Sequence, residues 1–419
     1  MPNNSESLQV PRTLSSWLFA ASFFYAPLSD LQVVEHVSIC DVLLVAAALI
    51  ALIERAVFRE PIIIPLPYMA VWLVFTLTLL MNLPTDGTEY WKSYAVTVIA
   101  AVFTPVAIVL MRVKNIGQMK FMLFAWTLGG LFGAGFILAY CNGYFTSHID
   151  RFWRYHERAR GLTHHPNLSG LGCFLTLPGL LLLLSSNRNL IARICALVLI
   201  VLVLKALDYT GTRSALVGAF ILLASWLFLT AVNLIRIGAL NRNHLGIGLI
   251  SLLVFCSGVL IYSMSGGGID VLSRVWTRLF AGDHFAQHSL LVRDILNRKA
   301  EEGFLDNPLF GGGFQWVAFS QSAVSHNIYL NYLQATGIFG LLGFTLTLLY
   351  PLIYPAKIFL QRPSESIGTI NNVLLAAALS MVAWLFAQSG AADYEVTLLF
   401  ALMLHISVWK LYPPRPINT

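Results

Sequence analysis

The sequence predicts an all-α integral membrane protein with about twelve transmembrane helices. Its 419 residues are 57% hydrophobic and only 11% charged, whereas an ordinary soluble domain is about 25% charged. A helix that spans a bilayer needs about 20 mostly apolar residues, and apolar runs of this kind recur along the whole chain. These observations exclude a transmembrane barrel, a disulfide-stabilised secreted domain and a soluble nucleotide-binding fold.

Twelve apolar runs predict the individual helices. The first two runs are short enough to form a tilted hairpin, which would leave the number of crossings even. The predicted helix cores are, in order, 15–28, 37–53, 63–83, 94–111, 121–140, 168–184, 191–207, 215–234, 247–264, 338–358, 373–387 and 396–411.

Lys and Arg in the short connections predict the orientation of these helices. Alternate connections and both termini carry 14 of the 26 basic residues. The polar stretch 1–16 is interpreted as a cytoplasmic tail rather than a signal peptide. Both termini are therefore predicted to be cytoplasmic. The basic residues on that side are Arg12, Arg55, Arg59, Arg112, Lys114, Lys120, Arg188, Arg193, Arg236, Arg242, Lys357, Arg362, Lys410 and Arg415.

The opposite face carries more basic residues than the positive-inside rule leads us to expect. Apart from Lys92, they fall in three segments, 145–167, 205–213 and 265–325. Cationic groups gathered outside the lipid on this face indicate an anionic ligand held at the membrane surface. These eleven residues are Arg151, Arg154, Arg158, Arg160, Lys205, Arg213, Arg274, Arg278, Arg293, Arg298 and Lys299.

The large outside loop, 265–325, is too regular in pattern to be a linker. Its apolar spacing predicts one or two helical turns at 271–280 and an amphipathic helix at 288–302. Ser325 is the expected N-cap of a third helix, whose polar face predicts a position along the membrane interface. That face carries Asn327, Asn331 and Gln334. The chain thus divides into 1–264, 265–336 and 337–419.

His326 is the candidate general base. It is expected in the first turn of that third helix, where the positive end of the helix dipole favours the neutral imidazole that a general base needs. The alternative is a histidine that caps loop structure at the interface.

Three arginines are candidates for binding phosphate. Arg213 begins the eighth predicted helix, Arg293 lies on the amphipathic stretch, and Arg160 precedes the sixth helix. A guanidinium can bind phosphate through two parallel N–H donors. The alternative for the first is snorkelling to lipid headgroups. For any one of them the alternative is a salt bridge, with Glu157, Asp294 or Glu301 as partners.

The remaining candidates for a chemical role are an aspartate, two adjacent histidines and the cysteines. Asp393, between the last two predicted helices, would orient a histidine or an arginine, or would cap the last helix. His164 and His165 lack the i, i+4 spacing and the nearby carboxylate of a metal site, so no metal is predicted. The five cysteines form no CxxC motif and the basic residues form no stripe, so neither a disulfide framework nor a nucleic-acid partner is predicted.

Four motifs lie between residues 160 and 340. They are His326-Asn327 followed by nine residues and Gly337-x-x-Gly340, Arg293 before Pro308-Leu309-Phe310-Gly311, Arg213 before Leu216-Val217, and Pro166-Asn167 before a helix. Together with the twelve helices, they resemble the superfamily of O-antigen ligases, O-antigen polymerases and O-linked oligosaccharyltransferases of bacterial inner membranes. The superfamily usually has Val or Ile where this chain has Phe310.

The resemblance implies a metal-independent, inverting glycosyltransferase with the helical membrane fold called GT-C, working without a cofactor at the periplasmic face. The donor would be undecaprenyl diphosphate carrying an O-antigen glycan, and the acceptor a sugar hydroxyl of lipid A-core. The residues implied are His326 as base, Arg213, Arg293 and Arg160 on the diphosphate, and Asn327 and Asp393 in support.

Three other functions share parts of this pattern. An O-antigen polymerase would extend the glycan on its own lipid carrier, and a protein O-oligosaccharyltransferase would use a protein acceptor. One large loop that closes at His326 favours the ligase. An organic-anion transporter would also use twelve helices, but transporters usually place charged features near the middle of the membrane, whereas here the charge lies at helix ends and in outside loops.

Overall fold

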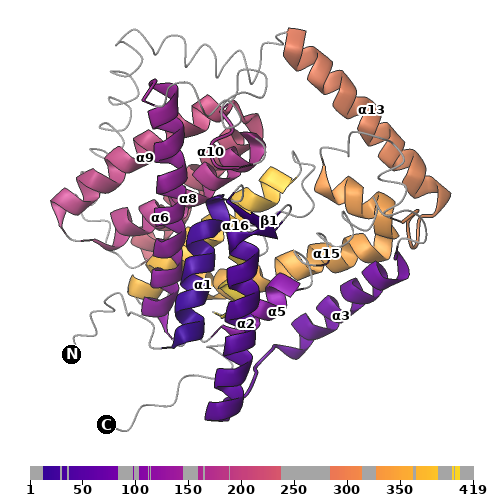
Figure 1. Ribbon diagram of the computed structural model, residues 1–419, viewed down its shortest axis with the longest axis horizontal. Helices are drawn as coiled ribbons and strands as arrows, with labels where there is room; N and C mark the ends of the chain where they lie inside the picture. The colour runs from indigo at the N-terminus through magenta and orange to yellow at the C-terminus, as the bar shows by residue number, and fades with distance from the viewer. Residues whose placement is uncertain are drawn as a thin grey trace.

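The computed structural model describes the chain in segments that are mainly α-helical (Figure 1). The described residues are 13–28, 31–34, 37–83, 98, 103–111, 113, 115–144, 159–163, 166–187, 189–236, 284–313, 327–361, 365–385, 399–400 and 402–405. The helices are α1 (Leu14–Tyr25), η1 (Ala26–Leu28), α2 (Ile39–Phe58), α3 (Leu66–Met81), α5 (Thr104–Leu110), α6 (Ile116–Cys141), α8 (Pro166–Ser186), α9 (Leu190–Thr210), α10 (Arg213–Arg236), α13 (His284–Asp306), α15 (Ile328–Leu360) and α16 (Glu365–Leu385). A short antiparallel sheet, β1 (Gln32–Val34) with β2 (Val37–Ser38), joins α1 to α2.

Six helices in the described part of the chain are long and apolar enough to cross a membrane, namely α6, α8, α9, α10, α15 and α16. This confirms the prediction of a helical protein of the membrane class. The predicted cores 121–140, 168–184, 191–207 and 215–234 each lie within one of these helices. The core 247–264 lies outside the described residues, as do parts of 94–111 and 396–411.

The starts and ends of the helices follow from local sequence. Ser38 and Asp41 form a capping box at the start of α2, in which the Asp41 N–H donates to Ser38 Oγ (3.1 Å) and the Ser38 N–H donates to Asp41 Oδ2 (2.8 Å). Asn189 caps α9 by accepting from the Ile191 N–H. Gly211 ends α9 with φ of 60°, a left-handed conformation that glycine adopts without steric cost. Local capping therefore positions the turn between α9 and α10.

Close packing between α6 and α8 relies on glycines that face threonines. A Cβ atom on Gly130 would lie 1.7 Å from Thr176 Oγ1, and one on Gly179 would lie 1.7 Å from Thr127 Oγ1. Each threonine hydroxyl donates to a carbonyl one turn earlier in its own helix, so both buried hydroxyls are paired. Small residues that let helix backbones approach in this way are typical of helix pairs in membranes.

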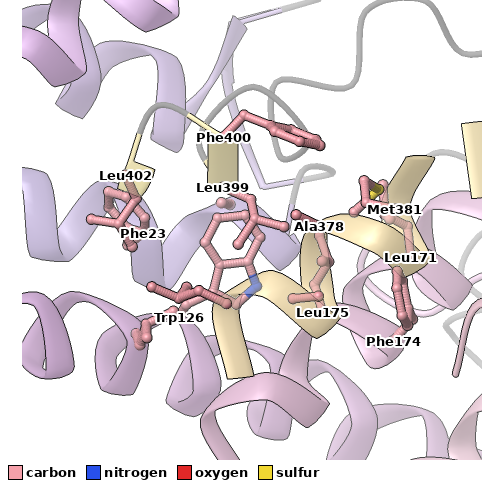
Figure 2. Packing of buried hydrophobic residues seen from close by; sticks show 14 of the residues in the cluster. Phe23, Trp126, Leu171, Phe174, Leu175, Ala378, Met381, Leu399, Phe400 and Leu402 are labelled. Carbon is pink, nitrogen blue, oxygen red and sulfur yellow. The ribbon is translucent and has the colours of Figure 1, made fainter. Parts of the chain in front are cut away.

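The hydrophobic core joins helices from both ends of the sequence. Phe23 of α1 packs edge-on against Trp126 of α6 with ring centroids 5.5 Å apart. Figure 2 shows them in one cluster with side chains from α8, α16 and the segment 399–405. The α16 residues of this cluster are buried, and α16 packs against α8, α10 and α15. Helices α8 and α16, which pack against each other, are the most buried of the six long apolar helices in the described bundle.

Helix α15 contains a sharp break at Gly337, where φ is 64° and ψ is −166°. Tyr332 before the break stacks on Phe344 after it, with ring centroids 4.1 Å apart. On a straight helix, positions twelve residues apart would be separated by about 18 Å along the axis, so the two parts of α15 bend toward each other. Phe75 of α3 packs against both rings.

The first part of α15 is the helix that the sequence predicted along the membrane interface, and its polar face is turned inward. Asn331 and Gln334 are each 4% exposed, whereas Leu330 and Leu333 are half-buried. The predicted grouping of polar and apolar positions is confirmed, and the Asn331 and Gln334 side chains are packed inside the described bundle. Polar side chains in a membrane bundle are more stable against neighbouring helices than against lipid.

Candidate functional site

Arg160 belongs to a short segment, 159–163, that is fixed by hydrogen bonds to two helix ends. The Ala159 N–H donates to the carbonyl of Tyr209 near the end of α9 (2.9 Å). The Arg160 carbonyl accepts from the hydroxyl of Thr163 (2.9 Å) and from that of Ser169 in α8. The Arg160 side chain is half-buried, with a buried Nε atom. The backbone of Arg160 is thus held where α8 starts and α9 ends.

Arg213 is the first residue of α10 and follows directly on the same region. The preceding residue, Thr212, is 1% exposed and donates from its hydroxyl to the carbonyl of Pro166, the first residue of α8 (2.9 Å). A Cβ on Gly170 would lie 2.7 Å from the Thr212 side chain, so α8 and α10 start side by side. The fold therefore brings the backbones of Arg160 and Arg213 to the same helix ends.

Asn327 is the N-cap of α15. Its side-chain oxygen accepts from the N–H groups of Tyr329 (3.0 Å) and Leu330 (3.3 Å), as N-cap asparagines do. The prediction of Ser325 as N-cap is wrong, because Asn327 supplies the acceptor two residues later. His326 therefore immediately precedes the N-cap rather than lying in the first helical turn.

The break at Gly337 receives the turn that follows α13. The N–H groups of Gly312 and Gly313 donate to the carbonyls of Gln334 (2.9 Å) and Ala335 (3.0 Å). In return, Ile338 and Phe339 donate to carbonyls of the turn. The acceptors are those of Pro308 (3.0 Å) and Leu309 (3.5 Å). We call this backbone pairing of 308–313 with 334–339 the turn–helix junction.

Two glycines are required at the turn–helix junction. Gly337 has positive φ, and a Cβ there would lie 2.3 Å from the Leu309 carbonyl oxygen. Gly311 has φ of 78°, and a Cβ there would lie 2.4 Å from the Ala335 carbonyl carbon. Both motifs named for the resemblance, Pro308–Gly311 and Gly337–Gly340, therefore meet in the structure.

Contacts at one end of the bundle show which helix ends lie together. Arg236, the last residue of α10, donates from Nη1 to the Phe359 carbonyl near the end of α15 (2.8 Å). Asn371 and Asn372, near the start of α16, donate to the carbonyls of Pro355 in α15 (2.9 Å) and Leu229 in α10 (3.4 Å). Helices α10 and α15 thus both end where α16 starts.

The opposite end of the bundle, where α8, α10 and α15 begin, holds three of the candidate residues. Here the Tyr329 hydroxyl, near the start of α15, donates to the Val382 carbonyl near the end of α16 (3.4 Å). Because α10 and α15 run antiparallel to α16, Arg213 and Asn327 lie at the same end of the bundle, together with the α8 start that holds Arg160. We call this end the cationic end of the bundle.

Arg293 lies in α13, a helix of 23 residues that includes the predicted amphipathic stretch 288–302. Helix α13 packs against α15. Figure 1 shows α13 at the side of the molecule away from α9. Of its predicted ion-pair partners, Asp294 pairs with Arg298 at 2.8 Å on the exposed face. Helix α13 is tied to the start of α15 through the turn–helix junction.

Several predicted features lie outside the described residues. His326 and Asp393 are among them, as are the side chains of Arg213 and Arg293. Within the residues that the structure does describe, no group of three or more His, Cys, Asp or Glu side chains could hold a metal ion.

Sequence reasoning missed the hydroxyl groups that fix the arginine segments, those of Thr163, Ser169 and Thr212. A signal for them exists in the sequence, since Ser and Thr close to helix starts and turns favour local hydrogen bonds to the backbone. Asn82 was also missed. It ends α3 and donates to the Phe310 carbonyl of the turn–helix junction (3.1 Å).

No protein-family model matches the chain, and no curated protein matches it.

Proposed function

We propose that this protein is a metal-independent, inverting glycosyltransferase that moves an O-antigen glycan from undecaprenyl diphosphate to a sugar hydroxyl of lipid A-core. The observation that carries the proposal is the cationic end of the bundle. The backbones of Arg160 and Arg213 lie together there, where α8 and α10 begin and α9 ends. Helix α15, which follows His326, begins at the same end of the bundle. The reaction needs cations for the diphosphate and a base for the acceptor on one membrane face.

In the proposed reaction, His326 takes the proton of the acceptor hydroxyl. The hydroxyl oxygen forms a bond to the anomeric carbon of the glycan while the bond from that carbon to the diphosphate oxygen breaks. Arg213, Arg293 and Arg160 stabilise the negative charge that develops on the leaving undecaprenyl diphosphate. Asn327 caps the start of α15 next to His326. Asp393 orients the histidine or one of the arginines.

The proposal also includes a location and a topology. The chain would cross the bacterial inner membrane twelve times in a GT-C-like arrangement, with both termini in the cytoplasm and the cationic end in the periplasm. Support comes from the other end of the bundle, where Arg193 and Arg236 donate to carbonyls of Asn187 (2.6 Å) and Phe359. Basic residues of this kind typically mark the cytoplasmic side.

The test is transfer in detergent with purified protein, undecaprenyl diphosphate O-antigen and lipid A-core, read as a gel shift of the lipid A-core. Parallel reactions contain a chelator or the His326→Ala variant. A shift that survives the chelator and is lost in the variant supports the proposal. Longer glycans on the lipid carrier without a shift would make the protein a polymerase, and uptake of radiolabelled anions into proteoliposomes without transfer would make it a transporter.

A further inference from the structure

The turn after α13 exposes large apolar side chains beside the polar Asp306 and Asn307. Leu305, at the end of α13, is 71% exposed, and Leu309 and Phe310 in the turn are 52% and 40% exposed. Exposed apolar groups that lie close together mark a surface that contacts another molecule or a membrane. We call these three residues the apolar tip.

The apolar tip continues onto an exposed stripe of α15. The rings of Phe310 and Phe339 lie 5.6 Å apart, and Phe339 is itself 43% exposed. Ile338, Leu342 and Leu346, on the same part of α15, are each more than two-fifths exposed. This part of α15 belongs to a helix apolar enough to cross a membrane, so its exposed side chains face lipid.

The length of α15 indicates the depth in the bilayer at which the apolar tip meets the exposed stripe of α15. Beyond the break, residues 338–360 form about 23 residues of helix, which at 1.5 Å per residue is roughly 35 Å. The hydrocarbon core of a bilayer is about 30 Å thick. The second part of α15 is therefore long enough to cross the bilayer by itself, which would place Phe310, beside Phe339, at the edge of the hydrocarbon.

The rest of α13 has the opposite character. Arg298 and Asp294 form an exposed ion pair, and Lys299, Glu301 and Glu302 are exposed as well. Its buried positions, Leu296, Ala300 and Gly303, recur at helical spacing and form the packed face of the helix. Apart from Ile295, the exposed part of α13 up to Glu302 is thus charged, and exposed apolar side chains gather beyond it, at Leu305, Leu309 and Phe310.

We infer that the apolar tip is a membrane anchor, whose partner is the acyl chains of one leaflet. The charged part of α13 lies in water, and the tip holds the end of the helix at the edge of the hydrocarbon. The turn–helix junction fixes the tip at this depth, since its backbone hydrogen bonds join it to the start of the membrane-crossing part of α15. The inference depends on α15 crossing a membrane and is independent of the proposed transfer reaction.

The test places the photoreactive amino acid p-benzoylphenylalanine at Phe310 in the full-length protein, which is reconstituted into phosphatidylcholine vesicles with radiolabelled acyl chains. The matched control carries the same amino acid at Glu301, an exposed position on the charged part of α13. After irradiation, protein-bound radioactivity is measured for both. The Phe310 variant is expected to take up roughly ten-fold more label, as an interfacial anchor would.

Two outcomes would overturn the inference. Equal labelling at the two positions would show that the tip has no special contact with acyl chains. Crosslinks from position 310 to another part of this chain or to a second copy, without lipid label, would show that protein covers the tip. Both readouts are independent of enzymatic activity, and monodisperse elution of each variant in detergent checks that it is folded.

Discussion

His326 directly precedes Asn327 in the sequence, and the Asn327 side chain makes two hydrogen bonds to the start of α15. A base must lie within hydrogen-bond reach of the proton it takes.

Replacing His326 with Ala is expected to reduce glycan transfer by about 10²- to 10⁴-fold, the usual contribution of a general base. The measurement is the initial rate of the gel-shift reaction, with thermal unfolding in detergent to show that the variant is folded. The matched control is Asn327→Ala, which removes the cap and should lower stability by about 1 kcal/mol. Transfer at the normal rate in His326→Ala would remove this residue from the mechanism.

Replacing Arg213 with Lys is expected to lower the transfer rate by roughly ten-fold, because Lys keeps the charge but lacks the planar pair of N–H donors. The matched comparison is Arg298→Lys, on the exposed face of α13, which should leave transfer unchanged. Rates are measured at several donor concentrations. Full activity in Arg213→Lys would contradict two-point binding of phosphate.

At the scale of residues, the sequence predicted which kinds of side chain could cap a helix or bond to the backbone. It did not predict which residue does so. Ser325 and Asn327 are both good N-cap residues, and only the path of the backbone decides between them. The hydroxyls of Thr163 and Ser169 were missed because their acceptor, the Arg160 carbonyl, is reached through a turn at Gly161 with φ of 59°. Sequence favours some local hydrogen bond for such hydroxyls but does not specify this acceptor.

Among the structural elements, the turn–helix junction gives a direct test of backbone conformation. Gly337→Ala would place a Cβ 2.3 Å from the Leu309 carbonyl oxygen in a conformation that other residues rarely adopt, and should destabilise the protein by at least about 1–3 kcal/mol. The measurement is thermal unfolding in detergent. The matched control is Gly135→Ala in α6, where a Cβ meets nothing within 4 Å.

The control should be neutral or stabilising by about 0.5–1 kcal/mol, since Ala favours a helix more than Gly does. Equal unfolding temperatures for Gly337→Ala and the unmodified protein would contradict the backbone pairing described for this junction. A loss of stability in both variants would instead point to a general intolerance of substitution.

The packing of α6 against α8 predicts coupling between Gly130 and Thr176. Gly130→Ala should destabilise by about 1–3 kcal/mol, because the added methyl group meets the threonine side chain. In the double variant with Thr176→Ala, the loss should be smaller than the sum of the single losses by at least about 0.5 kcal/mol. The four unfolding free energies are compared in one detergent, and simple additivity would argue against the contact.

At the scale of elements, the apolar runs predicted where helices lie but not which neighbouring helices are joined into one. Helix α15 joins the predicted loop helix to the predicted helix 338–358, because the bend at Gly337 is closed by the turn 308–313. Hydropathy reports the environment of side chains and contains no information on backbone pairing with a distant turn. The burial of Asn331 and Gln334 against other parts of the protein could not be predicted for a similar reason, since periodicity does not say which partner a face meets.

For the whole molecule, the proposal predicts the side of the membrane on which each helix end lies. Alkaline phosphatase, which is active only outside the cytoplasm, should be active when fused after Gly143 and inactive when fused after Asn187 or Gln361. The reason is that Arg193 and Arg236 lie at the predicted cytoplasmic end of the bundle. Green fluorescent protein at the same positions is the reciprocal control. Phosphatase activity after Asn187 would reverse the topology.

The general class of the molecule was predictable because composition alone requires a membrane environment. The gathering of Arg160 and Arg213 was predictable only in part, since basic residues on one side of the membrane need not be adjacent. Their adjacency depends on Thr212 and Gly170 packing at the starts of α8 and α10, a contact between helices that no local pattern specifies.

The break in α15 also bears on how this chain enters the membrane during synthesis. Residues 338–360 are long and apolar enough to leave the translocon sideways into lipid as one unit. The nine residues before the break carry Asn331 and Gln334, which would be costly in lipid until other helices surround them. Gly337 separates the two parts, so that insertion of the apolar part need not wait for the polar part. The polar part then folds onto α16 once α16 has itself been inserted.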